Sequence, residues 1–272
     1  MMDGHIHSPY CPHGTSDPIK SYIEKGISLG YKTMTFTEHA PLPPSFEDPV
    51  PEKDSSMAKR DVEKYVSELK SLKQTYKRDI QINIGFEVDY IEGFEKETES
   101  FLNEYGPELD DSILSVHFLK GKNEWYCLDY SPDMFQKARD DFGSIEALYE
   151  EYFSQIIRSA EANLGIYKPK RIGHFTLVKK FQQLFPSPTG WEQEAQEVLK
   201  VIKQQKLALD YNGAGMKKPH CQETYPPLHL AIEASQMGIP LIYGSDAHSI
   251  KGLKQGYEEI DTSLLTDDWT TL

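Results

Sequence analysis

Positive charge is scarce in this sequence. Its 272 residues include 29 lysines and arginines against 43 aspartates and glutamates, a formal net charge of −14 at pH 7. Such an excess of negative charge repels nucleic acids and anionic membranes, so binding of either by bulk charge is excluded. A small anionic substrate could bind only where a local positive centre overrides the field of the whole molecule.

Cysteine and long hydrophobic runs are scarce as well. The three cysteines, Cys11, Cys127 and Cys221, are odd in number and far apart, which excludes a disulfide framework and a CxxC metal motif. No apolar run approaches the ~18 residues that span a bilayer. The N-terminus has neither the basic nor the apolar region of a signal peptide. These absences predict a soluble, reduced, cytoplasmic protein with no membrane partner and no nucleic-acid partner.

Short apolar runs alternate along the chain with segments of helical period, which cover residues 19–27, 62–76, 145–156, 191–205 and 228–237. The runs are rich in β-branched or aromatic residues, as buried parallel strands are, and cover residues 4–8, 33–37, 80–88, 112–118, 171–175, 207–211 and 240–244. Seven such units predict a closed or nearly closed parallel α/β barrel, with a doubly wound open sheet as the alternative. No glycine-rich dinucleotide or P-loop motif follows any of the strands.

The segment 40–56 departs from this alternation because it is rich in proline. Its five prolines are too many for a helix, so we expect a semi-rigid flap that wraps over the surface.

Histidines and carboxylates gather at the ends of the predicted strands. Seven of the nine histidines lie within or just after a strand, and acidic residues join them; the set comprises His5, His7, His13, His39, Glu87, His117, His174, Asp246 and His248. Residues i and i+2 of a strand point the same way, so His5 and His7 can reach one ion. The carboxyl ends of parallel strands meet at one rim of a barrel. Imidazoles and carboxylates there suit zinc, manganese or iron, so a multinuclear metal site is predicted.

Four other residues receive a plainer interpretation. We expect Glu38 to support a ligand rather than to bind metal, and Cys11 to be a small buried thiol. His220 lies in a loop and His229 in a helical segment, so neither is expected at the site.

Seven motifs follow one another along the chain: Asp3-Gly4-His5-Ile6-His7-Ser8, His13-Gly14-Thr15, Thr37-Glu38-His39, Gly85-Phe86-Glu87, Ser115-Val116-His117-Phe118, Gly173-His174 and Ser245-Asp246-Ala247-His248. By these motifs the chain resembles the PHP (polymerase and histidinol phosphatase) family over nearly its whole length. Within that family, the chain is most similar to the monofunctional histidinol-phosphate phosphatases of histidine biosynthesis.

The resemblance implies a single domain, residues 1–272, folded as a distorted (β/α)7 TIM-like barrel with three divalent cations. It assigns the first ion to His5, His7, Glu87 and Asp246. Glu87 would bridge to a second ion bound by His117 and His174. His13, His39 and His248 would bind the third. Whether the metal is zinc, manganese or iron stays open.

The implied activity is hydrolysis of a small phosphomonoester, L-histidinol phosphate, to L-histidinol and phosphate. Three cations can polarise the phosphoryl group and lower the pKa of a bridging water to ~7, and we expect the resulting hydroxide to attack phosphorus in line. The catalytic candidates are Glu87, Asp246 and His248, with His248 or a coordinated water protonating the leaving group.

Substrate contacts can also be suggested from position. Arg171, three residues before His174, could bind the phosphate, although it could equally belong to a solvated basic turn. Phe46, Glu47 and Asp48 of the flap could favour the imidazole and amine.

Three rival interpretations remain. Another phosphoesterase of the same family, acting on phosphotyrosine, a nucleotide or a nucleic-acid diester, would use the same metals. A C–N hydrolase is disfavoured because no suitable lysine lies at a strand end. A metal-binding protein without turnover is the third.

Overall fold

A parallel sheet of seven strands forms the centre of the computed structural model, which describes residues 1–266. Residues 267–272 of the predicted domain lie outside the described part. The strands are β1 (Met2–Ile6), β2 (Thr33–His39), β3 (Gln81–Asp89), β4 (Ile113–Ser115), β7 (Arg171–Ile172), β8 (Ala208–Asn212) and β9 (Leu241–Gly244). Their order in the sheet follows their order in the chain. In a doubly wound sheet, by contrast, the strand order reverses partway across the sheet.

The two edges of the sheet meet beyond the ends of β1 and β9. The His7 amide donates to the Ala247 carbonyl at 3.1 Å, and the Asp246 amide donates to the His5 carbonyl at 2.7 Å. The sheet is therefore nearly closed into a barrel, and the predicted distorted (β/α)7 fold is confirmed.

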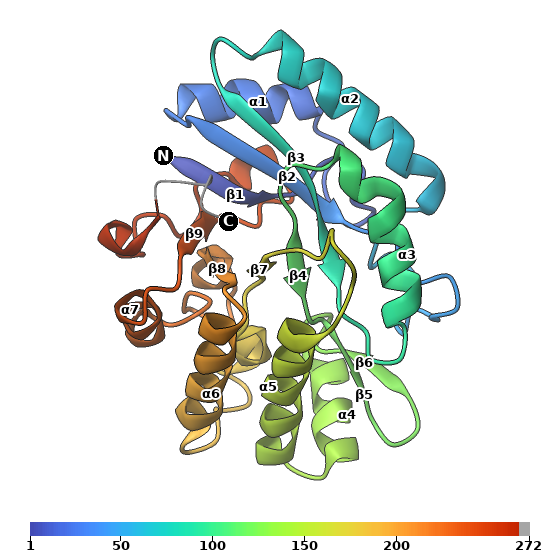
Figure 1. Ribbon diagram of the computed structural model, residues 1–272. Helices are drawn as coiled ribbons and strands as arrows, with labels where there is room; N and C mark the ends of the chain where they lie inside the picture. Colours follow the sequence, from blue (N-terminus) through green and yellow to red (C-terminus); the bar gives the residue numbers. More distant parts are fainter. Residues whose placement is uncertain (267–272) are drawn as a thin grey trace.

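Helices surround the strands on the outside (Figure 1). They are α1 (Ile19–Ser28), α2 (Val62–Thr75), α3 (Glu95–Tyr105), α4 (Pro132–Phe142), α5 (Ile145–Glu161), α6 (Trp191–Gln204) and α7 (Leu228–Gln236). All seven residues of β2 are buried, as expected of a parallel strand covered on both faces. None of the helices within residues 1–266 is long and apolar enough to cross a lipid bilayer.

Two helices and one hairpin were not among the predicted elements. These are α3, α4 and an antiparallel hairpin of β5 (Phe118–Lys120) and β6 (Trp125–Cys127). The predicted strand 112–118 was too long, because the chain leaves the sheet after Ser115 and enters the hairpin. The predicted strand 171–175 likewise ends at Ile172, just before His174. Both strands stop where a histidine turns toward the rim.

The proline-rich segment 40–56 contains no helix or strand, as predicted. Phe46 and Val50 anchor it, because they pack with Ile91, Phe118 and Cys127 in a small apolar cluster separate from the main core. The flap is thereby docked against the β5–β6 hairpin at the rim of the barrel.

Candidate metal centre

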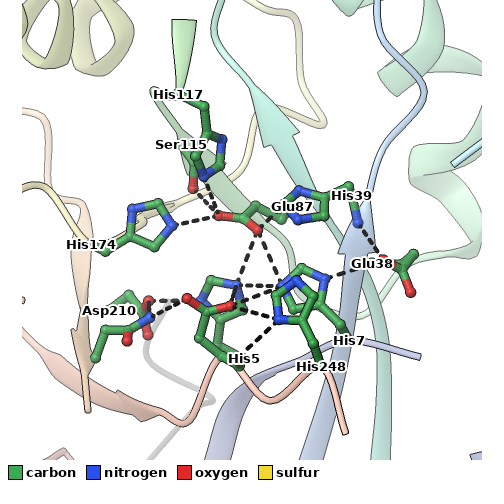
Figure 2. Close-up of polar contacts among 12 residues, drawn as sticks. His5, His7, Glu38, His39, Glu87, Ser115, His117, His174, Asp210 and His248 are labelled. Atoms are coloured by element: carbon green, nitrogen blue, oxygen red, sulfur yellow. Dashed lines mark hydrogen bonds and ion pairs between the residues drawn. The ribbon is translucent and has the colours of Figure 1, made fainter. Parts of the chain in front are cut away.

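Nine side chains predicted from the sequence to bind metal converge at the carboxyl ends of the strands. Figure 2 shows seven of them, His5, His7, His39, Glu87, His117, His174 and His248, pointing toward one another. His13 and Asp246 belong to the same group, because His13 stacks on the ring of His248 and Asp246 pairs with His7. The structure thus brings together residues separated by more than 200 positions in the chain.

Glu87 occupies the middle of this group and is only 1% exposed. Its Oε2 lies 3.2 Å from His5 Nε2 and 3.4 Å from His7 Nε2. Its Oε1 lies 2.8 Å from His174 Nε2 and 3.7 Å from His117 Nε2. Burial alone would raise the pKa of Glu87, but the surrounding histidines hold it well below its usual range. An ionised carboxylate whose two oxygens face two pairs of imidazoles has the geometry of a bridging ligand.

Asp246 lies just past β9 in the left-handed region, with φ 52°. Its Oδ1 is 3.2 Å from His7 Nε2 and 3.8 Å from His5 Nε2. A side chain from Gln255 donates to the Ser245 carbonyl at 2.6 Å and holds this turn in place. A left-handed backbone conformation is strained at a residue other than glycine, and such strain is often found at functional sites.

His13, His39 and His248 form a third group. The Nε2 atoms of His13 and His248 are 3.2 Å apart, and the ring of His39 lies 5.2 Å from that of His13. Burial and the charge of His7 hold the pKa values of His39 and His248 well below the usual range, so both are neutral and able to bind a cation. Two facing ring nitrogens can share at most one proton between them, whereas both can bind a metal ion.

In four of these histidines, Nδ1 lies within hydrogen-bond distance of an oxygen atom. Nδ1 of His5 lies 2.8 Å from Asp210 Oδ2, Nδ1 of His7 lies 3.2 Å from Glu38 Oε1, and Nδ1 of His117 lies 2.7 Å from Asp89 Oδ1. His13 Nδ1 donates to the Asp54 carbonyl at 2.9 Å. A partner at Nδ1 fixes the ring and leaves Nε2 to face the centre, the usual support of a metal-bound histidine.

Glu38 therefore lies where the sequence suggested, whereas Asp89 and Asp210 were missed. No residue of the predicted strand 207–211 was among the candidate ligands, although Asp210 lies inside it. A carboxylate inside an otherwise apolar strand was the signal, because such a group is rarely buried without a partner.

The arrangement fits metal ions by its donor set. Within residues 1–266, atoms that could coordinate a cation come together in four overlapping groups, which are His5–His7–Asp246, His5–Glu87–His174, His39–Asp89–His117 and His7–Cys11–His39–His248. All but Cys11 offer nitrogen or oxygen, and burial raises the pKa of the Cys11 thiol to about 12. Cys11 is thus a buried thiol, as expected.

A cavity of about 620 Å³ opens over these groups. Besides the histidines, its wall includes Glu52 and Asp54 from the flap, Tyr130 after the hairpin, and Lys180 after β7. The Tyr130 hydroxyl donates to Glu52 Oε2 at 2.7 Å and joins the flap to the opposite wall. The cavity has room for a small phosphate ester.

The structure corrects the expected role of Arg171. Its side chain is 0% exposed, does not line the cavity, and donates to Asp111 Oδ2 at 2.5 Å and to the Gly4 carbonyl at 2.8 Å. Arg171 begins β7, so it lies at the amino end of its strand while His174 lies past the carboxyl end. The guanidinium stabilises the interior of the barrel instead of contacting substrate.

The expected flap contacts are corrected as well. Phe46 belongs to the apolar cluster, and the Glu47 side chain is 90% exposed beside Lys53. Asp48 is used within the flap, where it accepts from the Val50 amide at 2.9 Å and from the Ser55 amide at 3.1 Å. The acidic flap residues that line the cavity are Glu52 and Asp54.

The two remaining histidines lie outside the site, as expected. His220 contacts the ring of Phe181, and His229 on α7 contacts Trp191.

Comparison with known proteins identifies the family to which this chain belongs. The model of the PHP domain matches residues 3–214. The chain is 46% identical to histidinol-phosphatase of Bacillus subtilis over 258 residues, which cover 94% of this chain and 96% of that protein. A Listeria monocytogenes protein provisionally assigned as a histidinol phosphatase has the same fold, with a TM-score of 0.91 and 37% identity over 95% of this chain and 99% of that one.

A more distant structure shares the fold alone. Histidinol phosphate phosphatase of Lactococcus lactis, solved with zinc, L-histidinol and phosphate, has a TM-score of 0.67 and 21% identity over 98% of both chains. The family resemblance seen in the sequence is thus confirmed by the domain match and by a close relative. The chain belongs to the PHP family.

Proposed function

We propose that this protein is a histidinol-phosphatase, a hydrolase that converts L-histidinol phosphate and water to L-histidinol and phosphate in histidine biosynthesis, in the cytoplasm. The observation that carries the proposal is the complete set of nine ligand candidates, Glu87 and the eight around it, beneath an open cavity. The 46% identity to a bacterial histidinol-phosphatase supports the substrate.

We assign three divalent cations, zinc, manganese or iron, to the three groups of side chains. His5, His7, Glu87 and Asp246 would hold the first, Glu87 with His117 and His174 the second, and His13, His39 and His248 the third. When bound, such cations polarise phosphoryl oxygens and make water a better nucleophile near neutral pH. They also supply the positive centre that an acidic protein needs to bind a phosphate dianion.

The side chains have distinct tasks in this proposal. Glu87 holds the first and second ligand groups at a fixed separation through its two oxygens. Asp246 completes the first group. His248 Nδ1 faces the Asp246 carbonyl at 3.1 Å, and a carbonyl only accepts, so the ring proton sits on Nδ1. Nε2 then has no proton to give to the leaving oxygen. We therefore assign His248 to binding rather than to proton donation.

The cationic end of the substrate would face the flap. Glu52 lies at the cavity wall with its carboxylate held by Tyr130, and Asp54 lies beside it. These carboxylates would attract the ammonium of L-histidinol phosphate while the phosphate lies deeper, over the histidines.

Phosphate release by purified protein tests the proposal. L-Histidinol phosphate would be compared with phosphotyrosine, AMP and a phosphodiester, each with added zinc or manganese. We expect a strong preference for L-histidinol phosphate. A greater kcat/KM for another ester would overturn the substrate and favour a different phosphoesterase of the family. Absence of turnover on every ester in metal-loaded protein would favour a metal-binding protein.

A further inference from the structure

A partly buried ion pair in the cavity wall has no part in the metal centre. Lys180 Nζ donates to Asp129 Oδ2 at 2.9 Å, and the two side chains are 19% and 23% exposed. Both residues line the cavity. An ion pair removed from water gains little net stability, because desolvation of both charges offsets their attraction. Its position beside a candidate active site therefore points to a role in function.

Lys180 lies on a segment that is hydrogen-bonded to the metal centre. It lies in the short 3-10 helix η3 (Leu177–Phe181), which begins three residues after His174. The Leu177 amide donates to the His174 carbonyl at 2.8 Å, so the turn that carries Lys180 starts from the backbone of a ligand candidate. The backbone that carries Lys180 is thus tied to the backbone of His174, and Asp129 orients its ammonium.

The charges around Lys180 keep it protonated. Burial would lower its pKa, but Asp129, together with Cys127 and Asp246, raises the pKa above the usual value. Burial would likewise raise the pKa of Asp129, but Lys180, His117 and His174 hold it below its usual range. Among the described residues, Asp129 is the single hydrogen-bond partner of the ammonium, which has three donors in all. Two N–H groups therefore remain for a ligand in the cavity.

The cavity has one other lysine, Lys218, which lies in an exposed loop at the rim. Carboxylates dominate the rest of the charged wall, namely Glu52, Asp54, Glu87, Asp89, Asp129 and Asp246. Of the two lysines that line the cavity, only Lys180 offers a partly buried ammonium to an entering phosphate dianion. Because Arg171 lies in the barrel interior, it does not compete for this role.

We infer that Lys180, oriented by Asp129, contacts the substrate phosphate and donates a hydrogen bond to one of its non-bridging oxygens. Asp129 is a positioning residue in this arrangement and does not touch the substrate. The inference rests on the proposed phosphomonoesterase activity, but it concerns phosphate binding and can be measured without turnover.

The test compares variants in metal-loaded protein, with inorganic phosphate as the probe. We expect Lys180→Met to weaken phosphate binding, measured by calorimetry, at least 10-fold, and to lower kcat/KM about 100-fold, the effect of removing one donor from a reacting group. Lys180→Arg should recover part of both losses. Metal content, measured by mass spectrometry, should equal that of the wild type. Lys218→Met is the matched control and should change phosphate affinity less than 3-fold.

The double variant Lys180→Met/Asp129→Asn distinguishes a phosphate contact of Lys180 from mere neutralisation of Asp129. It leaves no carboxylate unpaired at this position, so it is expected to fold where the single variant does not. If Lys180 only neutralises Asp129, the double variant regains wild-type phosphate affinity and the inference is wrong. A larger loss in Lys218→Met, or loss of metal from Lys180→Met, would also overturn it. If the wild type binds phosphate through Lys180 but does not hydrolyse L-histidinol phosphate, the proposed function fails and the inference stands.

Discussion

The carboxylate of Asp210 lies 2.8 Å from Nδ1 of His5, and both side chains are fully buried. The pair joins β8 to β1 across the barrel (Figure 2). Asn212 donates to the same Asp210 oxygen at 2.9 Å, so the carboxylate is itself held in place. His5 therefore presents Nε2 to the centre in one fixed orientation.

Asp210→Asn is expected to weaken metal binding without removing any proposed ligand. Loss of a carboxylate behind a metal-bound histidine typically costs 10- to 100-fold in metal affinity. Titration of metal-stripped protein with zinc would measure the change. Asp110→Asn, a carboxylate at the surface beside Lys73, is the matched control and should bind zinc as the wild type does. Equal zinc affinity for the two variants would show that Asp210 does not support His5.

Glu87→Ala should lose bound metal and nearly all turnover, because both oxygens that join the two pairs of histidines disappear. Metal ions that bind only the folded state stabilise it, so a chelator should lower the melting temperature of the wild type. Added zinc or manganese should restore both stability and activity. The melting temperature of Glu87→Ala is expected to respond to chelator much less. An equal response in both proteins would contradict the bridging role of Glu87.

Glu52→Gln should raise KM for L-histidinol phosphate by up to about 5-fold with little change in kcat, since an exposed charge pair contributes at most about 1 kcal/mol. Steady-state kinetics would measure both constants. The control is Glu47→Gln on the same flap, whose side chain is 90% exposed and pairs with Lys53. A KM effect in Glu47→Gln alone would favour the flap contact expected from sequence position over the proposed contact with Glu52.

Arg171→Met should reduce stability rather than phosphate affinity. Its removal leaves the Asp111 carboxylate without the guanidinium, and breaking a buried pair in this way costs about 3–5 kcal/mol. Urea denaturation would measure the loss. Arg171→Met/Asp111→Asn should recover part of it, because no buried charge is then left uncompensated. Wild-type stability together with weaker phosphate inhibition would restore Arg171 as a substrate contact.

Much of the barrel and the metal centre was predictable from the sequence alone. Apolar runs of strand length separated by helical segments imply a parallel sheet, and such a sheet gathers the carboxyl ends of its strands at one edge. A histidine or carboxylate at these ends is then placed near the others without knowledge of any contact. His5, His7, Glu87, His117 and His174 follow this rule, and the structure brings all of them together.

The less regular elements were not predictable in this way. The β5–β6 hairpin follows β4 almost without a break, so its apolar residues extended the predicted strand. Helix α3 carries only two buried residues, Thr98 and Leu102, which leaves little helical periodicity to recognise.

Only the tertiary structure decided which polar groups support the site and which lie away from it. Asp210 contacts His5, which is 205 positions away in the chain, and Arg171 contacts Asp111, which is 60 positions away. No local sequence pattern predicts either pair. The position along a strand explains the difference between Arg171 and His174. Residues at the amino end of a barrel strand remain in the interior, while those past the carboxyl end reach the cavity. Lys180 reaches the cavity wall for the same reason, because the chain turns back over the rim after His174.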